Sequence, residues 1–347
     1  MKPQSRRIPV RYLLQLRDML RESGVDTDRL LVMAGINEPR FNDASSLLSA
    51  AEVEAFVSSA RQLTGRTDLG FEAGRLIKMN SHELLGYGML SCRNVDQVLQ
   101  LVSRHYHLIT ETFTLRYRRE DRCGEAIYTP AMRMPLETLN FYYEVLVTAH
   151  CNQIRLLLGN DVPPYDCYLS MAEPAHGRRY LALAPARFHF EEKALPGVRV
   201  VMGTDLLNLP LPMADQRMVK QIDARCDALG QRPPADDEGW GDYVSMMLRQ
   251  ASGEIVTLED LARRINISPR TLDRHLKKEK LQFRDLSQQV RFEKARELLS
   301  APGATVVQVA LSLGFSDAAN FSRAFRRTVG ISPSQFQQDL AGDSSST

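Results

Sequence analysis

Hydrophobic residues recur at two different spacings along the first 229 residues of the chain. Helical spacing predicts helices over residues 10–21, 52–63, 95–109, 139–158 and 213–229, the last with Met218, Ile222 and Leu229 on its apolar side. Alternating or short apolar runs between turn residues predict strands over residues 112–117, 122–128, 168–171, 187–190 and 198–202, the first two as a hairpin. Both kinds of element together predict an α+β domain. At about 220 residues, it is large enough to enclose a small-molecule cavity.

The pattern breaks at residues 229–239, Leu-Gly-Gln-Arg-Pro-Pro-Ala-Asp-Asp-Glu-Gly. A pair of prolines cannot continue a helix and stiffens the chain, and the acidic cluster beside it has almost nothing to bury. Helical spacing resumes over residues 240–248. We therefore expect a first domain over residues 1–228, a linker over 229–239, an all-α domain over 240–337 and a flexible tail over 338–347.

Within the second domain the chain repeats itself. Residues 257–276 and 305–325 follow the same pattern at an offset of 48 residues, which grows to 49 after one insertion. The matched pairs include Thr257 with Thr305, Leu261 with Val309, Ala262 with Ala310, Leu272 with Phe321, Arg274 with Arg323 and Leu276 with Phe325. So many matches in register predict one structural unit built twice.

Each copy is predicted to be a helix-turn-helix, two short helices that meet at a tight turn. Thr257 is a suitable N-cap residue and has Asp260 three residues further on, as in a capping box. The first helix of each copy must end in a left-handed residue, which Asn and Gly tolerate best. The residues expected to end the first helices are Asn266 and Gly314, and those expected to cap the second helices are Ser268 and Ser316.

The second helix of each copy has one apolar side and one cationic side. Leu272 and Leu276 share the apolar side in the first copy, and Phe321 and Phe325 share it in the second. The opposite sides are rich in Arg and Lys, so such helices fit the major groove of double-stranded DNA, with Arg reaching guanine edges and phosphates. The predicted DNA-binding residues are Arg270, Thr271, Asp273, Arg274, Lys277, Lys278, Ala318, Ala319, Asn320, Ser322, Arg323, Arg326 and Arg327.

One long helix is predicted over residues 283–299, between the two copies. Its expected inner side consists of Phe283, Leu286, Val290, Ala295 and Leu298. A single helix would hold the two units at a fixed distance. One chain could then enter two successive major grooves on one face of the duplex, about 34 Å apart.

The second copy and the helix before it carry a set of specific motifs. These are Val309-Ala310, Gly314-Phe315-Ser316, Asn320-Phe321-Ser-Arg323-Ala-Phe325-Arg326, Gly330-Ile-Ser-Pro333-Ser-Gln-Phe336 and, before them, Arg291-Phe-Glu-Lys-Ala295-Arg-Glu-Leu298-Leu299. With these motifs, residues 240–337 resemble the DNA-binding domain of arabinose-regulator-type (AraC/XylS) transcription factors. Asn320 stands where members often carry Tyr, and Leu276 where they carry an aromatic residue. The resemblance implies a sequence-specific transcriptional activator that works with RNA polymerase.

A second resemblance is carried by His82-Glu-Leu-Leu-Gly86-Tyr-Gly88-Met-Leu and the predicted helix over residues 95–109. Residues 10–200 are similar to the effector domain of a subgroup related to ornithine-utilisation and fatty-acid-sensing virulence regulators. This resemblance implies that the first domain senses a small-molecule effector and can pair two copies of the chain into a homodimer. The sequence leaves the effector-binding residues unknown.

Composition and charge agree with this division. A chain with 44% hydrophobic and 25% charged residues is neither disordered nor fibrous, and no apolar run approaches the roughly 18 residues of a membrane span. Residues 253–336 carry 14 Lys and Arg against 9 Asp and Glu, a surplus that suits a polyanion. The basic start lacks the apolar core of a signal peptide, and five cysteines without a CxxC pair fit free thiols. We expect a cytoplasmic protein without a membrane contact.

No residues form a recognisable catalytic or metal-binding set. The chain lacks GxSxG, HExxH and P-loop motifs, and His105 and His107 face different sides of one predicted helix. Residues 116–119, Arg-Tyr-Arg-Arg, could bind an acidic effector, although a basic strand edge is the favoured interpretation. We expect no enzyme activity, no metal and no cofactor. Two alternatives stay open: a ligand-independent architectural DNA-binding protein, and an enzyme whose tail localises it to DNA.

Overall fold

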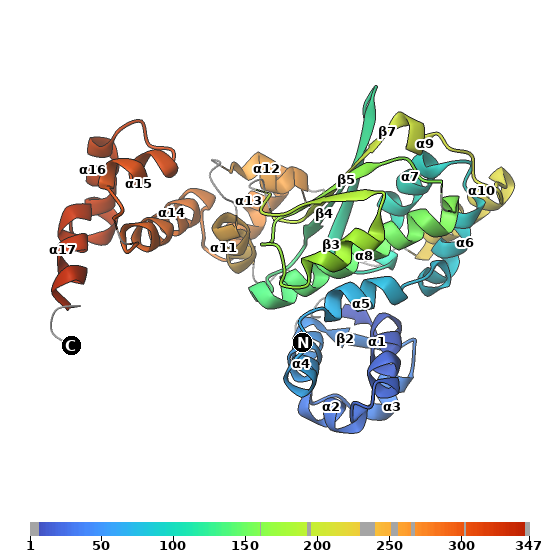
Figure 1. Cartoon of the computed structure of the whole chain (residues 1–347). Helices are drawn as coiled ribbons and strands as arrows, with labels where there is room; N and C mark the ends of the chain where they lie inside the picture. The colour runs from blue at the N-terminus through green and yellow to red at the C-terminus, as the bar shows by residue number, and fades with distance from the viewer. Residues whose placement is uncertain are drawn as a thin grey trace. The chain divides into compact units, whose positions relative to one another are not determined.

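The computed structural model of the chain describes residues 7–159, 161–192, 196–229, 240–250, 256–264, 268–301 and 303–343. These residues divide into two compact units (Figure 1). The larger unit holds the elements from β1 to α10, and the smaller unit holds those from α11 to α17. Apart from Leu229, the predicted linker lies outside the described residues, as do residues 344–347 of the predicted tail.

The larger unit begins with a helical region that the hydrophobic pattern predicts only in part. Its helices are α1 (Arg11–Glu22), α2 (Thr27–Met33), α3 (Glu38–Asn42), α4 (Ala50–Thr64) and α5 (Leu69–Leu76). A short antiparallel pair joins β1 (Arg7–Pro9) to β2 (Leu47–Ser49). Ser49 then begins α4 in a capping box with Glu52. The predicted bounds of α1 and α4 agree with the structure within two residues, whereas the shorter elements are too brief to show a period.

A five-stranded sheet follows, in the order β3-β4-β7-β5-β6. The strands are β3 (Phe113–Arg119), β4 (Cys123–Pro130), β5 (Tyr165–Leu169), β6 (Ala186–His189) and β7 (Val198–Gly203). The predicted β3–β4 hairpin is confirmed, and only β5 and β6 run parallel. The predicted start of β5 at Tyr168 is wrong by three residues, because the buried alternating positions are Tyr165, Cys167 and Leu169. Helices and sheet together confirm the α+β class.

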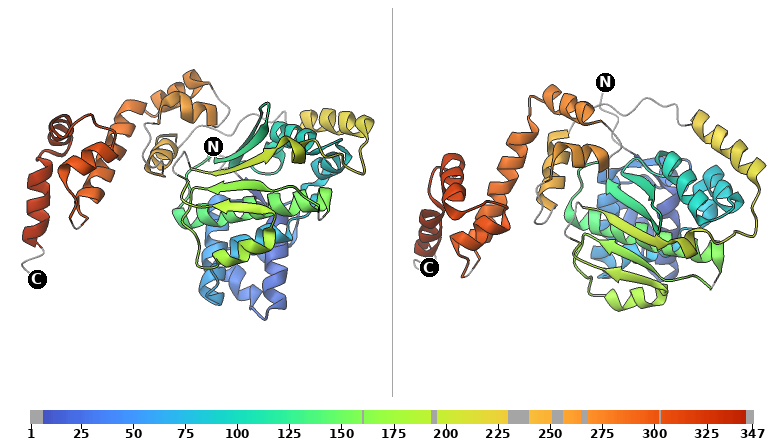
Figure 2. Two further views of the ribbon diagram at one scale, coloured as in Figure 1. Left: turned by 45° about the horizontal axis from the view of Figure 1, so that its top comes forward. Right: turned by 90° about the horizontal axis from the view of Figure 1, so that it is seen from above.

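Helix α8 (Leu136–Leu158) lies between the sheet and α5 (Figures 1 and 2). The approach of α5 to α8 depends on two glycines. A Cβ atom at Gly70 would lie 2.5 Å from the carbonyl oxygen of Phe141, and one at Gly74 would lie 2.6 Å from that of Val145. No larger residue fits without moving the backbone, so these glycines fix the distance between the two helices.

Further helical segments complete the larger unit. They are η1 (Met79–His82), α6 (Glu83–Ser91), α7 (Val95–His105), η2 (Tyr106–Leu108), η3 (Gly177–Leu183), α9 (Thr204–Leu207) and α10 (Gln216–Leu229). The predicted apolar side of α10 is right at Ile222 and wrong at its other two positions. Met218 and Leu229 are 42% and 57% exposed, and the buried residues are Val219, Ile222 and Cys226. Positions 219, 222 and 226 follow the helical period more closely, and they face α6.

In the part of the smaller unit that the structure describes, the regular elements are all helices. They are α11 (Trp240–Gln250), α12 (Leu258–Arg264), α13 (Pro269–Lys278), α14 (Phe283–Leu299), α15 (Val306–Ser312), α16 (Ala318–Val329) and α17 (Pro333–Asp343). Helix α14 packs on α11 and on α15 to α17, as Figure 1 shows. Its predicted inner side is only partly right, because Phe283 and Leu298 are half-buried. Phe292 and Leu299 are buried instead, since this end of α14 enters the core of the second helix-turn-helix.

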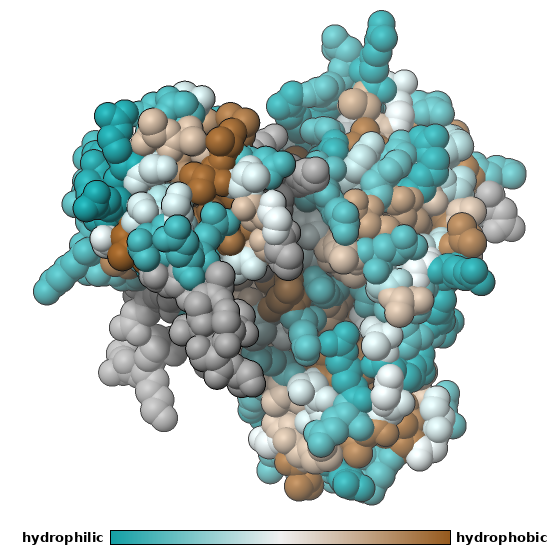
Figure 3. Space-filling model, turned by 60° about the vertical axis from the view of Figure 1, so that its left-hand side comes forward, coloured by the Kyte–Doolittle hydropathy of each residue, from teal (hydrophilic) through white to brown (hydrophobic). Residues whose placement is uncertain are grey.

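The surface of the molecule is mixed in character. Figure 3 shows one face, on which small groups of hydrophobic residues lie among hydrophilic ones. Among the described residues, none of the helices combines the length and the apolar composition that crossing a bilayer requires.

Candidate DNA-contacting helices and a buried pocket

The first helix-turn-helix consists of α12 and α13. Thr257 and Asp260 form the predicted capping box: the Thr257 amide donates to the Asp260 carboxylate at 3.1 Å, and the Asp260 amide donates to Thr257 Oγ1 at 3.1 Å. Ser268 caps α13, as predicted, by accepting from the Thr271 amide at 3.1 Å. Residues 265–267, which include the predicted left-handed Asn266, lie outside the described residues.

Helix α13 separates its apolar and cationic sides. Leu272 and Leu276 are fully buried, as the pattern predicts. Four of the predicted DNA-binding residues are exposed, Arg270, Arg274, Lys277 and Lys278, whereas Thr271 and Asp273 are half-buried. The Asp273 carboxylate lies 2.6 Å from Lys277 Nζ, so it offsets part of the positive charge of that residue. Arg270 and Arg274 are further exposed cations of this helix.

One further residue of α13, His275, is buried beside the predicted apolar side. His275 is 8% exposed, and its ring stacks on Trp240 of α11 with centroids 4.7 Å apart and planes at 8°. Its position three residues after Leu272 was the available signal, since residues three and four apart share a helix face. The stack fixes α13 against α11.

The second helix-turn-helix consists of α15 and α16. Thr305 caps α15 in a capping box with Gln308, and Gly314 ends the helix with φ of 74°, in the left-handed region that was predicted. The prediction that Ser316 caps α16 is wrong. Asp317 is the cap, and its carboxylate accepts from the Asn320 amide at 2.7 Å. A carboxylate is favoured there because its negative charge also interacts with the positive end of the helix dipole.

The residues around this cap form a connected network. Asn320 Nδ2 donates to Ser316 Oγ at 3.0 Å and to Asp317 Oδ2 at 2.7 Å. Asn320 Oδ1 in turn accepts from Arg323 Nη2 at 2.6 Å. Asn320 therefore links the start of α16 to Arg323, which restricts the guanidinium to the exposed side of the helix.

The two sides of α16 follow the prediction with two exceptions. Phe321 and Phe325 are fully buried, and Arg323, Arg326 and Arg327 are exposed, as are Ala319 and Asn320. Ala318 and Ser322 are half-buried. Ala318 packs on the core that contains Phe321 and Phe325, so its small side chain serves the interior at least as much as the surface.

Arg291 of α14 holds the turn of this second unit. Its Nε and Nη2 donate to the carbonyl oxygen of Leu313 at 2.9 and 2.6 Å, and its guanidinium lies 4.3 Å from the centroid of Phe315. Burial lowers the pKa of Arg291. The side chain thus satisfies the carbonyl of the residue that follows α15 and positions the chain that leads into α16.

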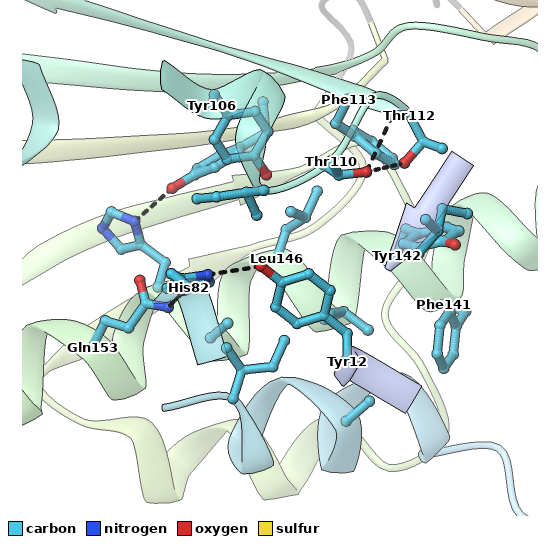
Figure 4. A pocket seen from close by; sticks show the side chains of 18 of the residues that line it. Tyr12, His82, Tyr106, Thr110, Thr112, Phe113, Phe141, Tyr142, Leu146 and Gln153 are labelled. Atoms are coloured by element: carbon cyan, nitrogen blue, oxygen red, sulfur yellow. Dashed lines mark hydrogen bonds between the residues drawn. The ribbon is translucent and has the colours of Figure 1, made fainter. Parts of the chain in front are cut away.

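The larger unit contains a pocket of about 90 Å³. It is bounded by α1, α8, the start of β3 and the segment around η1 and η2 (Figure 4). Its lining residues are mostly aromatic or aliphatic, and those that Figure 4 labels are Tyr12, His82, Tyr106, Thr110, Thr112, Phe113, Phe141, Tyr142, Leu146 and Gln153. These residues come from separate segments that only the fold brings together. None of them could therefore be predicted as a binding residue from the sequence.

Hydrogen bonds connect most polar groups of this pocket. The Tyr12 hydroxyl lies 3.0 Å from His82 Nδ1, and Gln153 Nε2 lies 2.6 Å from His82 Nε2. A second histidine, His150, has its Nδ1 2.9 Å from the Tyr128 hydroxyl. Burial lowers the pKa of both His82 and His150 to about 4, so both rings are neutral near pH 7.

Two known families match this chain. Residues 24–211 match the family described as the arabinose-binding domain of AraC transcription regulator, N-terminal, and residues 261–339 match a helix-turn-helix domain. The chain belongs to the AraC family of transcription regulators. As a member of this non-enzymatic family it acts by binding DNA, which removes the alternative of an enzyme.

Two relatives along most of the chain agree with the AraC-family assignment. The HTH-type transcriptional regulator VirS of Mycobacterium tuberculosis is 35% identical over 328 residues, 92% of this chain and 93% of VirS. The ornithine utilization regulator of Pseudomonas aeruginosa is 27% identical over 332 residues, 95% of this chain and 96% of the relative. The crystal structure of the regulator CdpR from Pseudomonas aeruginosa covers 90% of this chain and 96% of its own, with 20% identity and a TM-score of 0.42.

Other polar groups of this AraC-family regulator have structural partners. His105 Nε2 lies 2.6 Å from Asp223 Oδ1, which joins α7 to α10. On β3, an edge strand, Arg118 pairs with Glu120 and Arg119 lies 3.8 Å from Asp96, an arrangement that agrees with the favoured strand-edge interpretation. No cluster of three or more His, Cys, Asp or Glu side chains among the described residues is placed to hold a metal ion.

Proposed function

We propose that this AraC-family regulator activates transcription in response to a small molecule bound by its N-terminal domain. In this proposal, residues 1–228 sense the effector, residues 229–239 link, and residues 240–337 bind the operator. The observation that carries it is the combination of two capped helices with exposed cationic sides, α13 and α16, and an apolar pocket in the other unit. An architectural DNA binder has no need of such a pocket.

The exposed residues of α13 and α16 divide into two roles. Arg274 and Arg323 lie near the middle of the exposed sides, where an Arg can donate two hydrogen bonds to a guanine edge. Lys277, Lys278, Arg326 and Arg327 lie in the last turns, where they fit phosphates of the DNA backbone. The remaining predicted contacts, Arg270, Thr271, Asp273, Ala318, Ala319, Asn320 and Ser322, would shape the surface around these two arginines.

The two helix-turn-helix units are not identical, and one helix joins them. With 17 residues α14 is about 25 Å long. Two different units fixed to one helix fit an operator made of two unlike blocks about one helical turn apart, rather than a palindrome. Two copies of the chain would pair through the N-terminal domain, and activation would proceed by contact with RNA polymerase.

The experiment that tests this function begins with selection of an operator from random DNA by the full chain. Binding to that operator is then measured with and without a metabolite panel, which includes ornithine because one relative is named for its utilization. We expect a ligand that changes operator affinity or transcription from an operator-bearing promoter. Identical DNA binding with every metabolite, together with no thermal shift of the full chain, would favour the architectural alternative.

A further inference from the structure

The lining of the pocket in the larger unit carries no formal charge. Among the described residues that line it there is no Asp, Glu, Lys or Arg. The two histidines of the lining, His82 and His150, are neutral because burial keeps the pKa of both near 4. A charged ligand would therefore lose its hydration without gaining an ionic partner, which is strongly unfavourable.

Arg11 carries a positive charge and is next to the lining residue Tyr12 on α1. Its Nη1 lies 3.0 Å from Glu83 Oε1, and its Nη2 lies 3.5 Å from the carbonyl oxygen of Leu108. The guanidinium is thus paired with a carboxylate, while its buried Nε has no hydrogen-bond partner among the described residues. A ligand carboxylate would have to compete with Glu83 for this charge, which makes Arg11 the position to test.

Aromatic side chains dominate the walls. Tyr12, Tyr106, Phe113, Phe141 and Tyr142 all line the space (Figure 4). The ring centroids of Phe113 and Tyr142 are 5.6 Å apart, and those of Phe141 and Tyr142 are 5.4 Å apart. Such walls present π faces and ring edges, which favour a flat, apolar molecule.

Two lining residues have a buried polar atom that finds no hydrogen-bond partner among the described residues, the Tyr142 hydroxyl and His150 Nε2. Buried polar groups in proteins normally have a hydrogen-bond partner. Two polar atoms without one beside the same cavity therefore indicate that a bound ligand supplies the partner. Burial raises the pKa of Tyr142, so its hydroxyl stays protonated and can donate. A ligand with one uncharged oxygen, as a hydroxyl or carbonyl, would supply an acceptor.

The size of the space limits the ligand. An apolar cavity of about 150 Å³ holds one benzene molecule, so a space of about 90 Å³ limits the ligand to about the size of a single aromatic ring. We infer that the pocket binds an uncharged, largely apolar molecule of this size, such as a single aromatic ring with one hydrogen-bonding substituent. This inference rests on the proposed sensing function, of which it names the ligand class and the site.

The test measures binding to the full chain by calorimetry with matched compounds. The neutral probes are p-cresol, benzyl alcohol and toluene, and the charged ones of similar shape are benzoate and benzylammonium. We expect the neutral probes to bind at least tenfold more tightly than the charged ones. Leu146→Trp, which fills the pocket, should abolish binding, and Leu156→Trp, on the exposed side of the same helix, should leave it unchanged. Tyr142→Phe should weaken p-cresol but not toluene.

The outcomes separate this inference from the proposed function. Preferential binding of benzoate that disappears in Arg11→Gln would overturn the uncharged class, as would binding of a charged amino acid that Leu146→Trp removes. Failure of every neutral probe to bind the folded chain would also overturn it. In each of these cases the sensing function still stands if some other metabolite changes operator affinity.

Discussion

At the scale of single residues, Asn320 at the start of α16 fixes the position of other side chains. Asn320 accepts from Arg323 and donates to Asp317, so one amide joins a cap to an expected base-reading residue. From the sequence, Asn320 was predicted as a DNA contact and noted as a departure from a family pattern, but its link to Arg323 was not foreseen. Its neighbour Asp317, one residue after the predicted cap Ser316, is the cap itself. Both roles depend on where the helix begins, and a boundary shift of one residue is beyond what spacing can resolve.

Replacing the central arginines should reduce specificity. Arg274→Ala or Arg323→Ala should each weaken binding to the selected operator by about 1–3 kcal/mol, because a guanine edge loses a two-point contact. Binding to random DNA should weaken less. Competition binding against both DNAs at fixed salt measures the difference, with Arg21→Ala in the larger unit as the control. Equal loss on both DNAs would make these residues phosphate contacts.

The corrected cap of α16 gives a second prediction. Asp317→Ala should lower the melting temperature and the operator affinity more than Ser316→Ala, because Asp317 accepts the Asn320 amide. That hydrogen bond holds the pKa of Asp317 below its usual value of 3.8. A lowered pKa in the folded state gives stability that is present above pH 3.8 and is lost as the pH falls further. The two variants should therefore converge in acid, and a larger effect of Ser316→Ala at pH 7 would reject the assignment.

At the scale of elements, the sequence predicted those whose period is long or repeated. The hairpin of β3 and β4, helix α8 and the two helix-turn-helix units all follow from alternation, helical spacing or internal repetition. The apolar side of α10 was misjudged, because Met218 and Leu229 are as hydrophobic as the residues that are buried. The helical period of Val219, Ile222 and Cys226, together with contact with α6, distinguishes the two sides. The buried side of α14 also depends on tertiary contacts. It changes along the helix because the two ends of α14 pack into different cores.

The packing of α10 on α6 passes over Gly88 and can be tested by substitution. A Cβ atom there would lie 2.9 Å from Ile222 Cγ2 and 2.9 Å from Leu101 Cδ2. Gly88→Ala should therefore destabilise the chain by about 1–3 kcal/mol, the usual cost of overpacking. Denaturant unfolding measures the change, and Met218→Ala, on the exposed side of α10, should be nearly neutral.

A double-mutant cycle provides the control for this contact. Ile222→Ala removes the atom that the new methyl group would meet, so Gly88→Ala should cost less in that background than in the wild type. Additive losses would mean that the two residues do not press on each other. In that case α10 packs on α6 differently from the contacts described above.

At the scale of the whole molecule, the sequence predicted the class of function but not the sensing site. The cationic sides of α13 and α16 lie on continuous segments, so spacing alone could place them. The pocket combines α1, η1, η2, β3 and α8, and no spacing rule joins Tyr12 to His82 or Gln153. Its unpaired Tyr142 and His150 atoms are visible only when every neighbour is in place. Sensing sites of this kind are properties of the tertiary fold.

The single helix between the two DNA-binding units gives a prediction about operator spacing. An insertion of about five base pairs between the two operator blocks turns one block to the opposite side of the duplex, since a helical turn is about 10–10.5 base pairs. Tight binding by one chain should then be lost.

An insertion of about ten base pairs returns both blocks to the same side of the duplex, but it moves them about 34 Å further apart. Helix α14 is only about 25 Å long, so it cannot span this added distance. A rigid α14 therefore predicts loss of binding with both insertions, measured by gel shift at a chain concentration that keeps each complex at one chain per DNA. Recovery with ten base pairs would mean that the two units move independently, and survival with five would mean that one unit alone provides the affinity.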